Sequence, residues 1–360
     1  RLYFLFAVFG ILLFVGCPIS VSIVVFINCN GLVFSVVGSD YIYHHAKMNG
    51  GVESFSLLAV PLFILAGNIM NNGGIARRLV NFAKLFCGWI PGSLAQANVL
   101  GNMLFGALSG SAVAASSAMG GCIYPIQKEE GYDPAFATAV NIASAPTGLL
   151  IPPTSAFIVY STVAGGVSIS ALFMAGYIPG ILMGLGTMIV AFIYAKKHKY
   201  PTTGFVPMKE ALKVTFEAIP SLLLIVIVIG GIVGGIFTAT EGAGVCVLYC
   251  LILSIIYKSI DMKLFMKILL NSAATSGIIL FLISASSAMS WVMAYSGIPA
   301  AISSGLMSIT DNKYILLLLN EYHFVNCWYV YGHHTGNPDF YTNLFRRLQR
   351  VLGCPLSSSA

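Results

Sequence analysis

Long apolar stretches separated by short polar segments dominate the chain. The first runs from Leu2 to about Asn28 and contains Pro18. Further stretches lie at 55–70, 93–108, 134–150, 168–195, 218–237, 242–257 and 268–294, with a shorter one at 314–319. Because about 20 apolar residues are enough to cross a bilayer as a helix, the pattern predicts an all-α polytopic membrane protein. We expect the first stretch to be a spanning helix bent at Pro18 rather than a signal peptide.

Composition agrees with a membrane protein. Only 8% of the residues are charged, 58% are hydrophobic, and the mean hydropathy is +0.88. These charged residues are too few to cover the surface of a water-soluble protein of 360 residues. Most of the surface must therefore face the lipid bilayer. The net charge of +6 is spread along the chain, which argues against a nucleic-acid partner. The eight cysteines form no CxxC pair, and we expect Cys246 and Cys250 to pack in a core.

The basic residues gather in three segments. These are Arg77, Arg78 and Lys84; Lys196, Lys197, Lys199, Lys209 and Lys213; and Lys258, Lys263 and Lys267. Loops rich in Lys and Arg usually face the cytoplasm, so we predict that all three segments lie on that side. Two apolar stretches, 218–237 and 242–257, separate the second segment from the third. An even number of membrane spans returns the chain to the side from which it started, so both segments can lie on the same side.

Two apolar segments contain residues that disfavour a continuous helix. Gly110 lies between two serines in segment 106–125, and segment 141–153 contains Pro146, Pro152 and Pro153. At membrane depth, unpaired backbone groups are tolerated only where they are buried in protein or line a wet cavity. Secondary transporters build ion and substrate sites from such broken helices. The alternative is that the small residues only allow close packing between helices.

A polar turn separates these two segments and predicts where the next helix begins. Asp133 is a favourable N-cap and Pro134 a favourable first helical residue. We therefore predict that 104–127 is a re-entrant hairpin and that 134–150 is an interrupted helix packed against it. Their broken tips would then meet near the middle of the membrane.

Five sequence blocks, in their order along the chain, resemble a known family. The blocks are 61–70, 109–114, 131–134, 144–153 and 237–241. They resemble the large membrane subunit of tripartite ATP-independent periplasmic (TRAP) transporters, and the resemblance covers about residues 1–319. It implies the ion-transporter superfamily fold, built from inverted repeats, and an elevator mechanism in the bacterial cytoplasmic (inner) membrane.

The resemblance also implies function and partners. It implies sodium-driven uptake of organic acids such as C4-dicarboxylates, sialic acids or sugar acids. The expected partners are a smaller membrane subunit and a periplasmic substrate-binding protein, with sodium as the coupling ion and no other cofactor. An intramembrane enzyme is the competing class, but the chain lacks His-Glu-x-x-His, Gly-x-Ser-x-Gly and Gly-Lys-[Ser/Thr] motifs, and we do not expect an enzyme.

The resemblance assigns site residues position by position. They are Ser109, Gly110 and Ser111 at the hairpin tip, and Asn141, Ser144, Ala145, Pro146, Thr147 and Gly148 in the broken helix. Together they should form one sodium site and half of the substrate site. Sodium is a hard cation that prefers oxygen ligands, and the expected ligands are Ser109, Ser111, Asn141 and Thr147.

Two further polar residues lie in or beside apolar stretches, and the sequence leaves their roles open. Glu241 either caps its own helix, which we favour, or joins a polar network. Asn68 either bridges helices or lines the transport path.

The domain prediction has three parts. Residues 1–213 form the N-terminal repeat, which includes the hairpin and the broken helix; residues 214–319 begin the C-terminal repeat; and residues 320–360 form an aberrant tail. The C-terminal repeat is incomplete, because this polar tail stands where a second hairpin and a second broken helix should follow. We therefore expect that the 360 residues as written do not transport.

A one-base frame shift near residue 320 accounts for the tail. Read one base out of frame, the codons of residues 329–345 permit Met-Tyr-Met-Asp-Ile-Thr-Pro followed by an apolar run, which resembles the family block expected at this place. His333, His334 and Asp339 would then have no catalytic meaning. The alternatives are a naturally divergent tail and, for the chain as a whole, a truncated or frame-shifted non-functional remnant of the subunit.

Overall fold

The computed structural model describes residues 2–34, 46–164, 167–202, 204, 206–297 and 299–300, with isolated residues between 304 and 322. The chain divides into two compact units. Unit 1 contains Arg1–Glu53 and Ile278–Ala360, and unit 2 contains Ser54–Gly277. All regular structure in the described ranges is helical. The predicted tail, apart from Tyr322, lies outside these ranges.

The N-terminal apolar stretch forms two helices, not one bent helix. Helix α1 (Leu2–Phe14) ends in a turn in which Gly16 has a φ of 88°, and α2 (Ile19–Phe34) begins after Pro18. The rings of Phe9 and Phe26 lie 5.9 Å apart, edge to face. One continuous helix would hold these residues about 25 Å apart. The prediction of a single helix bent at Pro18 is therefore wrong, because the left-handed glycine reverses the chain.

The core of unit 1 forms where α2 packs against the C-terminal part of α14 (Met262–Tyr295). Phe26 and Ile27 from α2 are buried with Ala285 and Ala288 from α14. The small alanines let the two helices approach closely, as is usual between membrane helices.

Unit 2 contains the remaining helices, and most of them follow the predicted apolar stretches. They are η1 (Phe55–Leu58), α4 (Ala59–Asn72), α5 (Ile75–Cys87), α6 (Ser93–Ser109), α7 (Ala112–Glu129), α8 (Pro134–Ser144), α9 (Thr147–Leu150), α10 (Ser155–Val163), α11 (Ile169–Lys197), α12 (Met208–Val233), α13 (Ala239–Ile256) and the start of α14.

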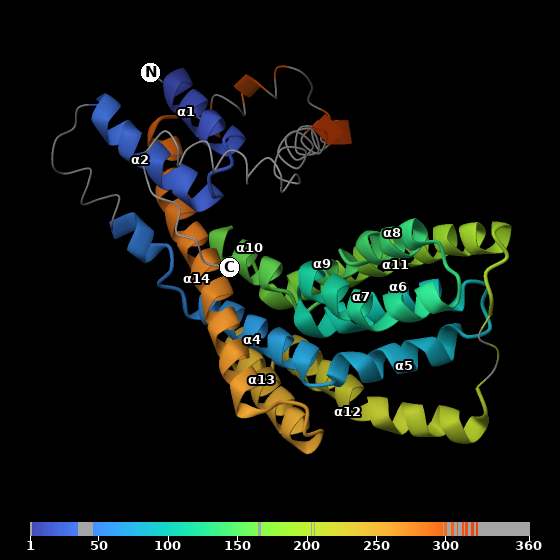
Figure 1. Cartoon of the computed structure of the whole chain (residues 1–360). Coiled ribbons are helices and arrows are strands. Elements are labelled where there is room, and N and C mark those ends of the chain that lie inside the picture. The colour runs from blue at the N-terminus through green and yellow to red at the C-terminus, as the bar shows by residue number, and fades with distance from the viewer. Residues whose placement is uncertain are drawn as a thin grey trace, which may run out of the picture. The chain divides into compact units, whose positions relative to one another are not determined.

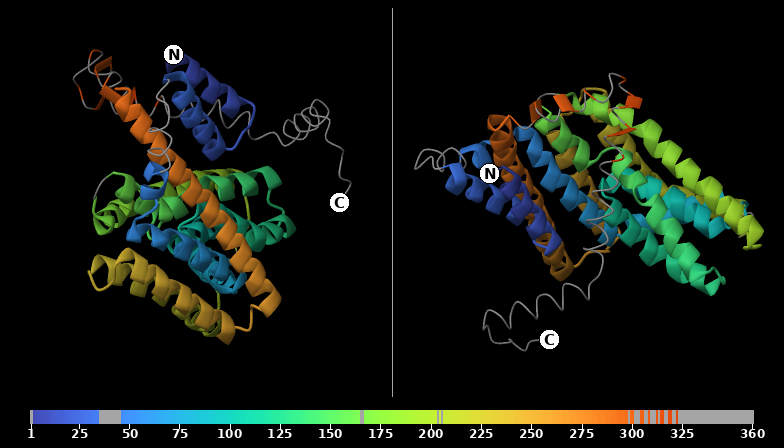
Figure 2. Two further views of the ribbon diagram at one scale, coloured as in Figure 1. Left: turned by 90° about the vertical axis from the view of Figure 1, so that its left-hand side faces the viewer. Right: turned by 90° about the horizontal axis from the view of Figure 1, so that it is seen from above.

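The helices of unit 2 stack in layers (Figure 1). Helices α8 and α11 pack on α6, α6 and α7 lie side by side, α5 packs on α6, and α12 packs on α5. The left-hand view of Figure 2 shows the same order within unit 2 from another side, with the green helices above the lighter blue α4 and α5, and the yellow helices below these. The pair α6 and α7 thus lies between other helices.

Five helical segments in the described ranges are long and apolar enough to cross a membrane. They are Phe55–Asn72, Ile169–Lys197, Met208–Val233, Ala239–Ile256 and Met262–Tyr295. A sixth results if Pro134–Leu150 and Ser155–Val163, which meet at an angle of 47°, form one broken span. The prediction of an all-α polytopic membrane protein is confirmed.

Helix α5 replaces one of the expected basic loops. Its buried face includes Leu79 and Ala83, whereas Arg77 and Asn81 are exposed on the opposite face. Trp89, just past its end, is 62% exposed. At 13 residues, α5 is too short to span a bilayer. Its buried face packs on α6 and α12, and its basic face is exposed.

Helix α5 also touches both of the other basic segments. The guanidinium carbon of Arg78 lies 3.4 Å from the centre of the Tyr257 ring, beside the segment that begins at Lys258. At the other end of α5, the N–H of Gly204 donates to the carbonyl of Gly88 at 3.1 Å. All three basic segments therefore lie along one short helix of unit 2.

Candidate functional site

The hairpin between α6 and α7 turns at the predicted glycine. Helix α6 ends at Ser109, Gly110 has a φ of 59°, and Ser111 is extended with a φ of −138°. The Ser111 hydroxyl accepts the N–H of Ala114 at 3.3 Å and caps α7. A Cβ on Gly110 would lie 2.6 Å from the carbonyl oxygen of Pro153. Only glycine fits this position, because both the left-handed backbone and the close approach exclude a side chain.

The helix after the hairpin is interrupted, and it begins at the predicted residue. The Asp133 carboxylate accepts the N–H of Phe136 at 3.0 Å, and Pro134 is the first residue of α8. The helix ends at Ser144, because Pro146 has no N–H to continue the ladder. After α9, residues 151–154 are not helical, and α10 then starts in a new direction.

The hairpin and the interrupted helix touch through their backbones. A Cβ on Gly106 of α6 would lie 2.0 Å from the Cα of Gly148 in α9. A Cβ on Gly148 would lie 2.8 Å from the Cα of Gly106 and 3.6 Å from the carbonyl oxygen of Ser111. The predicted packing of the two broken segments against each other is therefore present.

The hairpin tip brings together the first group of predicted site residues. Ser109 is buried, and its hydroxyl lies 3.5 Å from the carbonyl oxygen of Ser111. Thr147 is fully buried, and its hydroxyl donates to the carbonyl of Ser144 at 2.6 Å. Ala145 and Pro146 form the turn that separates α8 from α9. Ser109 and Ser111 therefore place hydroxyl and carbonyl oxygens at the tip, and Thr147 comes one residue before Gly148, whose backbone contacts the hairpin.

Two helix N-termini also meet at the tip. Ser111 caps α7, and Thr154 caps α10 by accepting the N–H of Ala156 at 3.2 Å. A Cβ on Gly110 would lie 2.9 Å from the Cα of Thr154, so the two caps are neighbours. Both helix ends carry free N–H groups and the positive end of a helix dipole.

Asn141 and Ser144 lie in a second polar cluster, further from the tip. They surround Asn102, which is seven residues before Ser109 and therefore about 10 Å along α6. The side chain of Asn102 lies 2.8 Å from the Ser144 hydroxyl and 3.1 Å from Oδ1 of Asn141. Asn98, one turn earlier on α6, completes the cluster, because its Oδ1 lies 3.0 Å from Nδ2 of Asn102. The predicted residues thus fall into two groups along the hairpin.

Asn98 and Asn102 belong to this cluster but were not predicted from the sequence. Both are fully buried. Two asparagines spaced four residues apart in the apolar stretch 93–108 share one helix face, and this spacing was the available signal.

The polar residues whose roles were open have structural partners. The Thr238 hydroxyl accepts the N–H of Glu241, and the Glu241 carboxylate accepts the N–H of Thr238, which is a capping box at the start of α13. The favoured role of Glu241 is confirmed. Nδ2 of Asn68 donates to the Ser272 hydroxyl at 2.8 Å, so Asn68 bridges α4 and α14. Cys246 and Cys250 are both buried, as expected.

Stacked aromatic rings fix the start of α8 to the end of α11. The rings of Tyr132 and Tyr200 lie 4.4 Å apart, and those of Phe136 and Tyr194 lie 4.2 Å apart. The N–H of Asp133 donates to the Tyr200 hydroxyl at 3.1 Å. Burial raises the pKa of Tyr132 to about 12, so this ring stays neutral at physiological pH.

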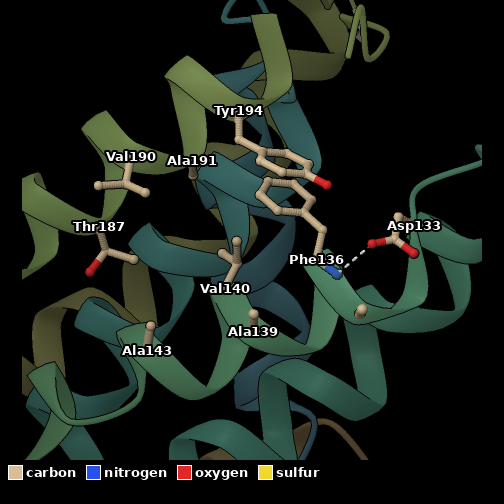
Figure 3. Close-up of a pocket in the computed structure, with 10 residues that line it drawn as sticks. Asp133, Phe136, Ala139, Val140, Ala143, Thr187, Val190, Ala191 and Tyr194 are labelled. Atoms are coloured by element: carbon tan, nitrogen blue, oxygen red, sulfur yellow. Dashed lines mark hydrogen bonds between the residues drawn. The ribbon is translucent and has the colours of Figure 1, made fainter. Parts of the chain in front are cut away.

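A groove of about 420 Å³ lies between α8 and α11 (Figure 3). It is lined by Asp133, Ala135, Phe136, Ala139, Val140, Ala143, Thr187, Val190, Ala191 and Tyr194. Ala139 and Ala143 lie on the face of α8 opposite Asn141, because successive residues of a helix are about 100° apart. None of the predicted site residues lines this groove, so its mostly apolar wall is distinct from the tip and from the asparagine cluster.

The site chemistry consists of neutral oxygens and helix ends. In the described ranges, no three His, Cys, Asp or Glu residues lie close enough to share a metal ion. Neutral oxygen ligands suit a monovalent cation better than a divalent one, which usually recruits carboxylates.

The fold and the site together define a polytopic helical membrane protein. The tip region of its hairpin packs on an interrupted helix, close to the interruption. The model of the family described as "Tripartite ATP-independent periplasmic transporter, DctM component" matches residues 6–331. The chain belongs to this family. The match extends past residue 319 by 12 residues, into the start of the predicted tail.

Curated relatives agree with the family. YgiK of Salmonella typhimurium is 48% identical over 315 residues, covering 88% of this chain and 72% of the relative. The sialic acid TRAP transporter large permease protein SiaM of Vibrio cholerae is 35% identical, covering 86% and 72%. The C4-dicarboxylate TRAP transporter large permease protein DctM of Rhodobacter capsulatus is 32% identical, covering 87% and 74%. The last two relatives are transporter permease subunits, not enzymes.

Proposed function

We propose that the chain is the permease subunit of a sodium-coupled secondary transporter that imports an organic acid by an elevator mechanism. The observation that carries this proposal is the backbone contact between Gly106 and Gly148, which packs the tip of a hairpin on a broken helix in a chain of the DctM family. The acid is of the C4-dicarboxylate, sialic acid or sugar acid type. The names of the relatives, which include sialic acid and C4-dicarboxylate permeases, support this choice.

The substrate carboxylate binds where α7 and α10 begin. The neighbouring caps, Ser111 and Thr154, place two positive helix ends side by side. Free N–H groups at a helix N-terminus bind anions without a basic side chain. An acid can be held there and released again, because no fixed cation binds it permanently.

The coupling sodium ion binds beside the carboxylate. We assign it to the predicted oxygens of Ser109, Ser111 and Thr147, together with the carbonyl end of α6. The negative end of that helix dipole favours a cation. The fourth predicted ligand, Asn141, lies with Asn102 in the second polar cluster.

The partners are a small membrane subunit and a periplasmic binding protein that delivers the acid. The protein lies in the bacterial inner membrane with its three basic segments on the cytoplasmic side. The excess of Lys and Arg in these segments supports a common side.

Uptake into proteoliposomes tests the function. The chain, and a version with the reading frame restored after residue 319, are each reconstituted with a small membrane subunit and a binding protein. An inward sodium gradient should drive uptake of a labelled C4-dicarboxylate, sialic acid or sugar acid by the restored version, and an equal potassium gradient should not. Equal uptake with either gradient would contradict sodium coupling.

A further inference from the structure

The groove between α8 and α11 has a polar end and an apolar end. Phe136, near the start of α8, stacks on Tyr194, near the end of α11, and Asp133 lies beside them (Figure 3). Ala143 and Thr187 lie at the opposite end of the groove. The two walls are therefore antiparallel, and the groove runs for about 10 Å along α11 from Tyr194 to Thr187.

The wall that α11 supplies continues into basic residues. The α11 residues of the groove follow the spacing i, i+3, i+4 and i+7 of one helix face: Thr187, Val190, Ala191 and Tyr194. The same spacing brings Lys197 and His198 onto this face at the end of α11. The His198 ring stacks on the Tyr194 ring at 4.2 Å, and Lys197 is exposed. The polar end of the groove is therefore flanked by a cation.

The groove has the depth of one lipid leaflet. Helix α11 is long and apolar enough to span a membrane, and Lys197 is its last residue. Thr187 lies about 15 Å from Lys197 along the helix axis. Half of the hydrocarbon core of a bilayer is also about 15 Å thick. The groove thus begins near the interface on the lysine side and ends near the middle of the bilayer.

Lipid can reach the groove from the side. Ala139 and Ala143 are exposed, and Val190 is 67% exposed. Their neighbours on α11, Ile189 and Ile193, are also exposed. Acyl chains are as apolar as these side chains, so this surface of a membrane span suits contact with lipid. The two alanines leave the space that a larger side chain would fill.

We propose that this groove binds one anionic phospholipid. An acyl chain lies between Ala139 and Val190, and the phosphate lies beside Lys197 and His198. Lipid binding at the groove needs neither sodium nor substrate, so it can be measured without uptake.

The charge at the polar end selects the headgroup. Segment 194–200 carries three basic side chains, Lys196, Lys197 and Lys199, and no acidic one. Lysines near the membrane surface attract anionic lipids. On the opposite rim, Oδ2 of Asp133 accepts the N–H of Phe136, and the other carboxylate oxygen can accept a headgroup hydroxyl. Phosphatidylglycerol, which carries a net negative charge and glycerol hydroxyls, fits this combination.

Native mass spectrometry of the purified chain in detergent measures lipid binding directly. The chain is titrated with phosphatidylglycerol and with zwitterionic phosphatidylcholine and phosphatidylethanolamine that carry the same acyl chains. We expect one phosphatidylglycerol to bind about tenfold more tightly than either zwitterionic lipid, because several lysines face its headgroup. Equal affinity for the three lipids would overturn the proposed site.

Ala139→Trp tests whether the acyl chain lies in the groove. The indole should fill the space beside Val190 and weaken phosphatidylglycerol binding at least tenfold. Ala175→Trp is the matched control, because Ala175 is exposed on α11 but lies about 18 Å from Thr187, outside the groove. The same loss of affinity in both variants, or no loss in Ala139→Trp, would contradict this location.

Lys197→Gln tests the headgroup contact. Removing one interfacial charge should weaken phosphatidylglycerol binding about fivefold and leave phosphatidylcholine binding unchanged. Lys209→Gln is the matched control, because Lys209 is an exposed lysine of the same basic segment in α12, which packs on α5 and lies away from α8 (Figure 1). Both lysines are exposed, so this pair decides the question even if Ala139→Trp fails to fold. Equal affinity in Lys197→Gln and the parent chain would contradict the headgroup contact.

The version with the reading frame restored after residue 319 provides the last comparison. All lining residues of the groove lie between Asp133 and Tyr194, so the restored version should bind phosphatidylglycerol as tightly as the 360-residue chain does. If the restored version excludes the lipid, the C-terminal part of the protein covers the groove and the lipid site is wrong.

Discussion

The backbones of Gly106 and Gly148 are in direct contact, so close that neither residue has room for a Cβ. The contact joins the last turns of the hairpin arm α6 to the short helix α9. It holds Ser111 beside Gly148 and places the oxygens of the tip within one small region. A single methyl group at this contact would separate the two halves of the proposed site.

Gly106→Ala tests the contact. The added Cβ would lie 2.0 Å from the Cα of Gly148, so the helices must move apart. We expect a destabilisation of about 2–3 kcal/mol, at the upper end of the range for overpacked sites. The measurement is thermal or denaturant unfolding in detergent.

Gly121→Ala is the matched control for that change. Gly121 lies in α7 of the same hairpin, and a Cβ there meets no atom within 4 Å. This variant should be neutral or stabilise by up to about 1 kcal/mol, because alanine favours a helix more than glycine does. If both variants lose the same amount of unfolding free energy, the close contact with Gly148 is not the reason that Gly106 must be glycine.

The capping box of α13 predicts an effect on stability alone. Thr238→Ala removes the oxygen that accepts the N–H of Glu241 and should cost about 1 kcal/mol. Sodium dependence and substrate preference should stay the same, because the cap serves only its own helix. A changed sodium response of uptake in Thr238→Ala would assign this end of α13 to the transport path.

The side of the basic segments is tested by cysteine labelling. A cysteine at Lys199, which is exposed in the loop after α11, should resist a membrane-impermeant maleimide in intact cells and react after lysis. Ile236→Cys, in the exposed turn between α12 and α13, should react in intact cells, because α12 separates it from Lys209. Labelling in the opposite pattern would invert the proposed topology.

Local backbone chemistry made several elements predictable from the sequence. Asp133 before Pro134 predicted the start of α8, Gly110 predicted the hairpin turn, and Glu241 predicted the cap of α13. Each of these depends on residues within four positions of one another. The division into inverted repeats is a longer-range statement, and it stays a prediction.

Tertiary contacts explain what the sequence did not reveal. The bend expected at Pro18 is a full reversal, because Phe9 packs on Phe26 and Gly16 permits the turn. The asparagine cluster depends on α8 crossing α6 at Asn102, a register that neither helix specifies alone. Apolar periodicity predicts which stretches are helices, but not which polar residues of two helices will meet.

Resequencing the gene around codon 320 tests the predicted frame shift. We expect one base to be missing or inserted there, with the restored frame reading Met-Tyr-Met-Asp-Ile-Thr-Pro. An unchanged frame on independent template would mean that the tail is genuine and that the prediction is wrong.

The sodium response of uptake in Ser111→Ala tests the central claim most directly. Ser168→Ala is its matched control, because Ser168 caps α11 in the way that Ser111 caps α7, by accepting an N–H three residues later. Both variants lose a helix cap, at a cost of about 1 kcal/mol each, but only Ser111 lies at the proposed ion site. In the frame-restored protein, we predict that Ser111→Ala raises the sodium concentration for half-maximal uptake several-fold, while Ser168→Ala leaves it unchanged. The same sodium dependence in both variants and the parent would contradict the assignment of the hairpin tip as the site where sodium and substrate bind.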